Sequence, residues 1–239
     1  MGTLLNRRRY MGGGSSLPYD AEIEYLEGTG TQYIDTGFYP RTTNVNIKVE
    51  NKFNKSTLAG DNCILGARTA AQGDKGFKLP NFYNHTIECQ GLVGAGSQSH
   101  QGDLIGEFDI DTDYTLYCEI EKDSQNFYIN GVLNKALTAS ISSCDSGGTL
   151  YMFAMHQNGT RWQFKGKIYY CKIWQDDMLV RDYIPVRVGT TGYMYDRCTN
   201  TLFGNAGSRT FTLGPDKIGG GKYLIINMLC GYSVERRAA

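Results

Sequence analysis

The sequence has no excess of charge of either sign. Its 239 residues include 24 Lys and Arg and 24 Asp and Glu, so the formal net charge at pH 7 is zero. Broad nucleic-acid binding needs a basic face, which this balance does not supply. No apolar run approaches the roughly 18 residues of a membrane-spanning helix, and the N-terminus lacks the apolar core of a secretion signal. We therefore expect neither nucleic-acid binding nor membrane insertion.

Paired cysteine motifs are also missing. The cysteines are odd in number, with no C-x-x-C pair: Cys63, Cys89, Cys118, Cys144, Cys171, Cys198 and Cys230. A disulfide scaffold or a zinc site would need pairing or ligand spacing, and neither is visible. Cys118 and Cys171 share strand faces with apolar residues, which is typical of small core side chains. We expect reduced, structural cysteines in a protein that folds in a reducing cytoplasm.

Catalytic motifs are scarce. The three histidines, His85, His100 and His156, have no shared ligand spacing and predict no metal centre. There is no G-x-S-x-G nucleophile elbow, and no glycine-rich segment ends in the Gly-Lys-Ser/Thr of a phosphate-binding loop. The sequence therefore predicts no resident cofactor and no catalytic residue.

The sequence does contain the pattern of an all-β protein. Its 30 glycines and 17 tyrosines fit short strands joined by tight turns. Asn130-Gly131 predicts a type I′ hairpin turn, which needs positive φ at both positions. No helical periodicity extends beyond two turns, whereas period-two alternation recurs. Besides the two strands of this hairpin, strands are predicted at 21–27, 45–53, 63–67, 75–82, 86–93, 104–110, 167–174 and 178–188.

Three blocks of the sequence resemble a known family. They are LPYDAEIEYLEGTGTQYIDTGFYP (17–40), YTLYCEIEKDSQNFYINGVL (114–133) and, within 164–215, the pattern LVRDYIPVR…GYMYDR…LFGNAG. These blocks resemble the LamG, concanavalin A-like jelly rolls of bacteriophage and Bacteroides-type bacterial proteins. The resemblance implies an all-β jelly-roll sandwich over about 17–216. Because this fold serves many roles, it implies little about function.

The two ends of the chain differ from the predicted domain. Residues 1–16 combine Arg7, Arg8 and Arg9 with a Gly/Ser-rich linker, and we expect this basic arm to anchor the protein on a larger assembly. Residues 217–239 form a C-terminal extension with an apolar run of about eight residues, too short for a membrane. That run suits an extra strand, either of this sheet or donated to a neighbour's edge.

The strongest catalytic candidate is an acidic strand face. In a strand, Glu107, Asp109 and Asp111 would project to one side. Glycoside hydrolases of the resembling fold use a Glu-x-Asp-x-Glu strand, and a retaining enzyme needs two carboxyl groups about 5–5.5 Å apart. Here an Asp stands at the third position, and the acidic face continues to Asp113. Both features favour a solvated face over a hydrolase.

Two aromatic-polar segments are candidate sugar-binding loops. Rings beside amides and a guanidinium supply stacking and directional hydrogen bonds. The alternative is that Trp162 packs in the core and the polar residues cap a turn. The candidate residues are Tyr83, His85, His156, Arg161 and Trp162.

Calcium is a further candidate ligand, because LamG-like domains often hold it through loop oxygens. Loop acids and amides that could contribute are Asp61, Asn62, Asp74 and Asp103. No single pattern among them selects a site.

These observations lead us to expect a non-enzymatic virion protein of a bacteriophage, made in the host cytoplasm. It would decorate a head or tail, attach through its arm to other virion proteins, and display a lectin-like jelly roll to a host glycan. By analogy with jelly-roll virion proteins we expect a homo-oligomer, such as a trimer. The alternative is a carbohydrate-binding module of a bacterial surface or secreted protein, followed by a glycoside hydrolase of the same fold.

Overall fold

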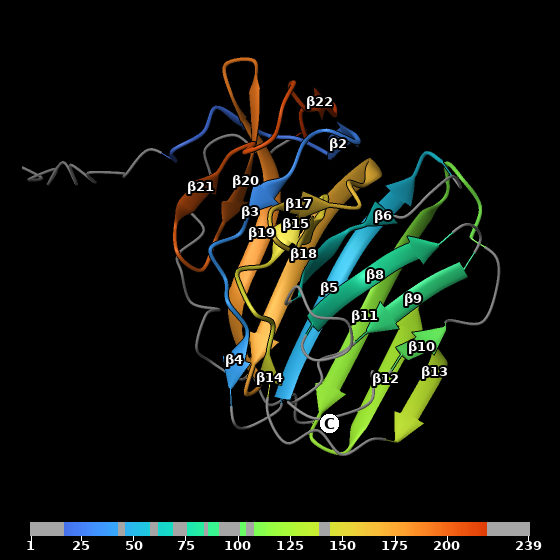
Figure 1. Ribbon diagram of the computed structural model, residues 1–239. Helices are drawn as coiled ribbons and strands as arrows, with labels where there is room; N and C mark the ends of the chain where they lie inside the picture. Colours follow the sequence, from blue (N-terminus) through green and yellow to red (C-terminus); the bar gives the residue numbers. More distant parts are fainter. Residues whose placement is uncertain are drawn as a thin grey trace, which may run out of the picture.

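The computed structural model describes residues 17–42, 46–57, 62–68, 76–83, 86–90, 101–103, 108–138 and 144–218. In these residues the regular elements are β-strands, in two main sheets and one small one (Figure 1). The same residues include no helix long and apolar enough to cross a membrane. The basic arm and almost all of the C-terminal extension lie outside this part of the chain.

The first sheet is the larger one, and its long strands run antiparallel through the whole molecule. Its main path is β13 (Val132–Thr138), β12 (Ser124–Ile129), β11 (Asp113–Glu121), β5 (Asn46–Lys55), β18 (Lys165–Gln175), β19 (Met178–Val188), β20 (Thr191–Asp196) and β21 (Thr201–Phe203). Three short strands join it beside β18 and β19: β1 (Ala21–Glu22), β2 (Leu26–Thr29) and β22 (Thr212–Leu213).

The second sheet lies in front of the first in Figure 1. Its path is β10 (Gln101–Asp103), β9 (Thr86–Gln90), β8 (Gly76–Tyr83), β7 (Leu65–Arg68), β15 (Tyr151–Met152) and β3 (Ile34–Asp35). Three further strands pair with it: β6 (Asn62–Cys63), β16 (Met155–His156) and β17 (Thr160–Arg161). A separate pair, β4 (Arg41–Thr42) and β14 (Cys144–Asp145), lies at the lower end of the view.

The core lies between the two sheets, where alternate residues of each strand meet. In β11 the buried residues are Leu116, Cys118 and Ile120, and the residues between them reach solvent. Cys63, Cys118 and Cys171 are free thiols without any exposed surface, as the sequence predicted for core cysteines.

Cys198 departs from the expectation for cysteines. It is disulfide-bonded, and its partner is not among the side chains that the structure describes. The prediction of a fully reduced set is therefore wrong for this residue. Disulfide pairing depends on proximity in the folded chain, which sequence spacing does not report.

Strand β18 also departs from strict alternation. Its register with β5 shifts between Ile168 and Tyr170, which is a β-bulge. As a result Ile168, Cys171 and Ile173 face the core together, while Tyr169 and Tyr170 are both partly exposed. The period-two alternation expected of the predicted strand 167–174 fails at the bulge, because the extra residue moves every later side chain to the other face.

The predicted hairpin turn joins β12 and β13. Asn130 and Gly131 have φ angles of 49° and 80°, so both lie in the region that a type I′ turn requires. The Asn130 side chain also accepts a hydrogen bond from the Thr115 amide, at 2.8 Å, and so ties the turn to β11.

Candidate functional site

Three rings stack on the outer side of the second sheet. The ring centroids of Tyr33 and Tyr151 are 4.8 Å apart, and those of Tyr151 and His156 are 4.1 Å apart with only 4° between the planes. The neighbours Ile34 and Met152 are fully buried, so alternation turns Tyr33 and Tyr151 away from the core. We call Tyr33, Tyr151 and His156 the aromatic ladder.

Glycines close both ends of the aromatic ladder. A Cβ atom at Gly207 would lie 3.1 Å from a ring carbon of Tyr33 and 2.3 Å from the carbonyl oxygen of Thr31. A Cβ atom at Gly148 would lie 3.0 Å from the His156 ring. Only glycine permits so close an approach of backbone to ring at Gly207. The ring faces are therefore covered, and the ladder presents its edges.

A loop that follows β21 fixes the position of Tyr33. The Asn205 side-chain oxygen accepts from the amides of Tyr33, at 3.2 Å, and Gly207, at 2.9 Å. The Ala206 amide donates to the Tyr33 carbonyl at 2.8 Å. Residues 205–210 thus form one wall of the site, although they lie far from Tyr33 in sequence.

The polar edges of the ladder are available to a ligand. His156 Nδ1 lies 2.9 Å from the Thr149 carbonyl oxygen, which only accepts, so Nδ1 carries the proton and Nε2 of the neutral ring is an acceptor. In the described residues, neither phenol of Tyr33 and Tyr151 makes a hydrogen bond. Burial, with the nearby carboxylate of Asp35, raises the pKa of Tyr151 and keeps its phenol protonated.

The hairpin formed by β16 and β17 carries the predicted residues His156, Arg161 and Trp162. Thr160 pairs with His156, and Arg161, which is exposed, is the next residue. Trp162 is partly exposed, with φ of 49°, and the Arg68 guanidinium lies 5.2 Å from its ring centroid. Trp162 is therefore not fully enclosed in the core.

The other two predicted residues are located less completely. Tyr83 ends β8, where only the backbone is described, and His85 lies outside the described residues. The backbone does connect this region to Trp162. β6 pairs with β8, and the Cys63 amide of β6 donates to the Trp162 carbonyl at 2.7 Å.

The acidic strand face does not form. Residues 108–112 are a turn and irregular chain, with Asp111 at φ of 57°, and Glu107 lies outside the described residues. Asp109 and Asp111 are exposed and do not share a strand face, so the predicted strand at 104–110 is wrong over 108–110, and the rest of it lies outside the described residues. Asp111 tolerates the left-handed conformation that ends this segment, whereas a strand needs extended residues.

No candidate metal centre emerges from the described residues, which contain no group of three or more His, Cys, Asp or Glu side chains able to hold an ion. Of the calcium candidates, Asn62 is buried at 3% exposure, Asp61 and Asp74 are not described, and only the backbone of Asp103 is. Calcium binding stays a prediction.

A second set of aromatic residues occupies the outer face of the first sheet. The phenols of Tyr117 and Tyr128 both donate to the Glu119 carboxylate, at 3.2 and 3.1 Å, and Tyr169 donates to Asp113 at 2.8 Å. Burial and the Glu50 carboxylate raise the pKa of Tyr170 to about 12. We call Tyr117, Tyr128, Tyr169 and Tyr170 the tyrosine face.

Lysines cover two rings of the tyrosine face. The Lys52 ammonium lies 4.6 Å from the Tyr169 centroid, and the Lys172 ammonium lies 5.2 Å from that of Tyr170. Lys52 is also 3.1 Å from Asp113, so Lys52, Asp113 and Tyr169 all contact one another. This face satisfies its own polar groups.

Comparison with protein-family models found no match, and neither did comparison with curated proteins. Solved structures do match. A Bacteroides ovatus protein described as a candidate carbohydrate-binding protein superposes with a TM-score of 0.57 at 13% identity, over 82% of this chain and 61% of that one. The chain therefore spans less than two thirds of that protein's length.

Two further structures have the same architecture. The carbohydrate-binding module of a Ruminococcus gnavus IT-sialidase, in complex with α2,3-sialyllactose, gives a TM-score of 0.51 at 12% identity, over 64% of this chain and 90% of the module. Domains LG4-5 of the mouse laminin α1 chain give 0.51 at 12% identity, over 83% and 47%. The fold is a concanavalin A-like jelly-roll sandwich, as the sequence predicted.

Proposed function

We propose that the protein is a non-catalytic glycan-binding module and that the aromatic ladder with Trp162 is its binding site. The observation that carries the proposal is the unoccupied polar edge of the ladder. Tyr33 and Tyr151 offer hydroxyls that both donate and accept, and His156 offers an acceptor at Nε2. Sugar hydroxyls need this mixture of donors and acceptors, fixed in direction by a rigid support.

The similar structures support this proposal. Two of the three are described by their carbohydrate binding, and the Ruminococcus module was solved with a sialylated sugar. Fold alone does not carry function, so the ladder and not the resemblance defines the site.

The hypothesis of a carbohydrate-binding module has more support than the hypothesis of a virion protein. The anchoring residues Arg7, Arg8 and Arg9 lie outside the described residues, and attachment to a virion stays a prediction from the sequence resemblance, as does homo-oligomer assembly. The disulfide at Cys198 is typical of proteins that work in oxidising surroundings, which supports the alternative location over the cytoplasm. We propose that the protein works at the bacterial surface or outside the cell.

A glycan array tests the proposal. Wild-type protein should bind a subset of the immobilised glycans. Trp162→Ala and the double variant Tyr33→Phe/Tyr151→Phe, which keeps both rings, should lose that signal. Tyr128→Phe on the tyrosine face is the matched control and should bind as wild type does. Absence of any signal from correctly folded wild-type protein would refute the proposed function, and full binding by the double variant would refute the site.

A further inference from the structure

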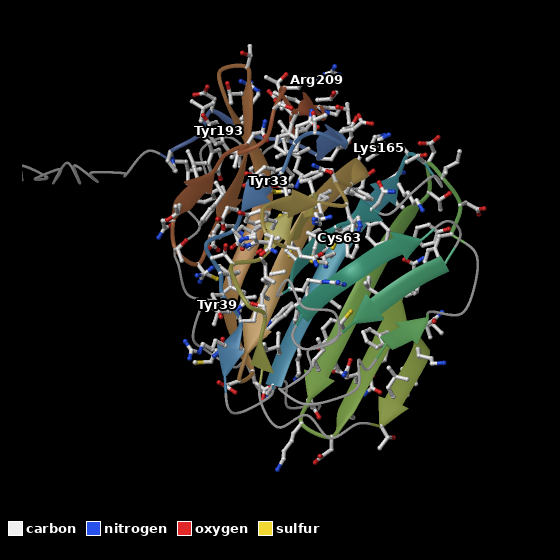
Figure 2. The ribbon with its side chains drawn as sticks, viewed as in Figure 1. Tyr33, Tyr39, Cys63, Lys165, Tyr193 and Arg209 are labelled. Carbon is white, nitrogen blue, oxygen red and sulfur yellow. The ribbon has the colours of Figure 1, made fainter. Side chains whose placement is uncertain are left out.

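An exposed carboxylate, that of Asp35, lies beside the aromatic ladder. In the antiparallel pair of β15 and β3, Tyr151 is directly opposite Asp35. Side chains in directly opposite positions point to the same face of a sheet, with Cβ atoms about 4.5–5.5 Å apart. Tyr33 immediately precedes β3 (Figure 2) and shares this face with Asp35, because Ile34 between them is fully buried. Asp35 therefore lies next to both tyrosines of the ladder.

The charge of Asp35 acts on the ladder. Burial and then the Asp35 carboxylate raise the pKa of Tyr151, and no lysine or arginine in the described residues lowers it. Arg161 pairs with Met155, so its side chain leaves β17 on the face opposite to that of His156. The nearest described charge that the ladder senses is therefore negative.

Asp35 differs from other exposed aspartates in having no ion pair among the described residues. Asp113, Asp177 and Asp216 lie 3.1, 2.6 and 2.6 Å from lysine or arginine nitrogens. Asp35 Oδ1 accepts from the Gly37 amide at 3.0 Å, which orients the carboxylate, while Oδ2 makes no hydrogen bond in this part of the chain. Oδ2 can therefore accept from a ligand without first breaking an ion pair.

The ladder as a whole is rich in acceptors. The Asp35 carboxylate and Nε2 of the neutral His156 ring can only accept, and the phenols of Tyr33 and Tyr151 can donate or accept. A sugar substituent that carries several donors and a positive charge matches this arrangement. An anionic substituent would meet a like charge, which opposes binding.

From this arrangement we propose that Asp35 determines the specificity of the ladder, so that the module prefers glycans with a free amino group over their neutral counterparts, and both over acidic glycans. The ammonium of an amino sugar donates to the carboxylate, and such charge-assisted hydrogen bonds are about twice as strong as neutral ones. The phenols and His156 bind the hydroxyls of the same sugar. This inference rests on the proposed glycan-binding function.

Two sugars, lactosamine and chitobiose, test the preference when each is prepared with its amino nitrogen free, acetylated or sulfated. One position is then cationic, neutral or anionic on an unchanged core. Calorimetric titration should show the free amine binding about threefold to fivefold more tightly than the acetylated form, the size of an exposed ion pair, and the sulfated form binding most weakly. These differences should shrink when ionic strength rises from about 0.01 M to about 1 M, because the Debye length falls from about 30 Å to about 3 Å.

The variant Asp35→Asn removes the charge and keeps the side-chain oxygen that accepts from the Gly37 amide. It should unfold as wild type does in urea and bind the free, acetylated and sulfated forms with similar affinity. Asp20→Asn is the matched control, because the exposed Asp20 also accepts from a glycine amide, that of Gly189 at 2.7 Å, but immediately precedes β1 of the first sheet. The control should keep the wild-type preference.

Three results would overturn the inference and leave the proposed function intact. They are equal binding of the three forms by wild type, tighter binding of the sulfated form, and an unchanged preference in Asp35→Asn. Failure of every form to bind a protein that does bind other glycans on the array would overturn it too. Absence of any glycan signal, here and on the array, would overturn both the inference and the proposed function.

Discussion

The aromatic ladder and the tyrosine face use the same residue type in opposite ways. On the tyrosine face, the phenols of Tyr117 and Tyr169 donate to the protein's own carboxylates. On the ladder, the ring faces are covered by one another and by glycines, while the phenols lack partners in the described structure. Under the proposed function, the tyrosines that bind sugar are those whose hydroxyls the chain leaves unused.

Cross-strand register explains the difference. Tyr117 pairs with Tyr128 on one side and with Glu50 on the other, and the partner of Glu119 on β5 is Lys48. Long antiparallel strands thus place acid, base and phenol side by side, where they pair. The strands of the ladder are only two residues long. Tyr151 pairs with Gly66, which has no side chain, and with Asp35, whose carboxylate accepts from the Gly37 amide instead. In the described residues the Tyr151 phenol therefore has no cross-strand hydrogen-bond partner.

The largest effect should come from Gly207, which closes the Tyr33 end of the ladder. Gly207→Val places a branched side chain against the Thr31 carbonyl and the Tyr33 ring, so the loop must move. We expect a loss of about 1–3 kcal/mol in the free energy of unfolding. Glycan binding should be lost as well, because Tyr33 is displaced.

Urea unfolding and glycan titration measure both quantities. Ser208→Ala is the control, because the exposed Ser208 side chain makes no hydrogen bond in the described structure. A Gly207→Val protein that binds glycan at wild-type affinity would show that the ladder does not need its glycine contact.

The tyrosine face should be sensitive to acid through Asp113. Partial burial raises the pKa of Asp113. Hydrogen bonds from Asn54 and Tyr169 and the ammonium of Lys52 together lower it by more, so the pKa in the folded protein lies below its usual value. A depressed carboxylate pKa stabilises the fold above the unfolded pKa of about 3.9, and this contribution is lost as pH falls through the folded pKa.

Asp113→Asn should therefore be less stable than wild type at pH 7, and the gap should close below about pH 4. Urea unfolding of both proteins at a series of pH values measures this difference in the free energy of unfolding. A gap that stays constant down to the acid limit would show that the effect of the substitution does not come from ionised Asp113.

The sequence predicted the fold well because strands and tight turns have recognisable patterns within a few consecutive residues. Period-two alternation marks β5 and β11, and Asn130-Gly131 marks its own turn. Exceptions arose where the backbone departs from period two, at the Tyr169 bulge and at the left-handed Asp111. Both depend on tertiary context, which alternation alone cannot report.

The candidate site was predicted only in part, for a different physical reason. His156, Arg161 and Trp162 were found because they are close in sequence and of types that bind sugars. Tyr33 and Tyr151 were missed, because their stacking joins strands separated by more than a hundred residues. The one local signal was alternation, since both tyrosines precede a buried residue and so face outward.

The most direct test of the account compares Tyr151→Phe with Tyr117→Phe, each of which removes one hydroxyl and keeps the ring. For Tyr151→Phe we predict glycan affinity reduced about fivefold to tenfold, the value of one hydrogen bond, with no change in the free energy of unfolding. For Tyr117→Phe we predict wild-type affinity and about 1 kcal/mol less stability. Both quantities come from calorimetric titration and urea unfolding of the same preparations. The account is contradicted if Tyr151→Phe binds as wild type does, or if Tyr117→Phe loses affinity instead.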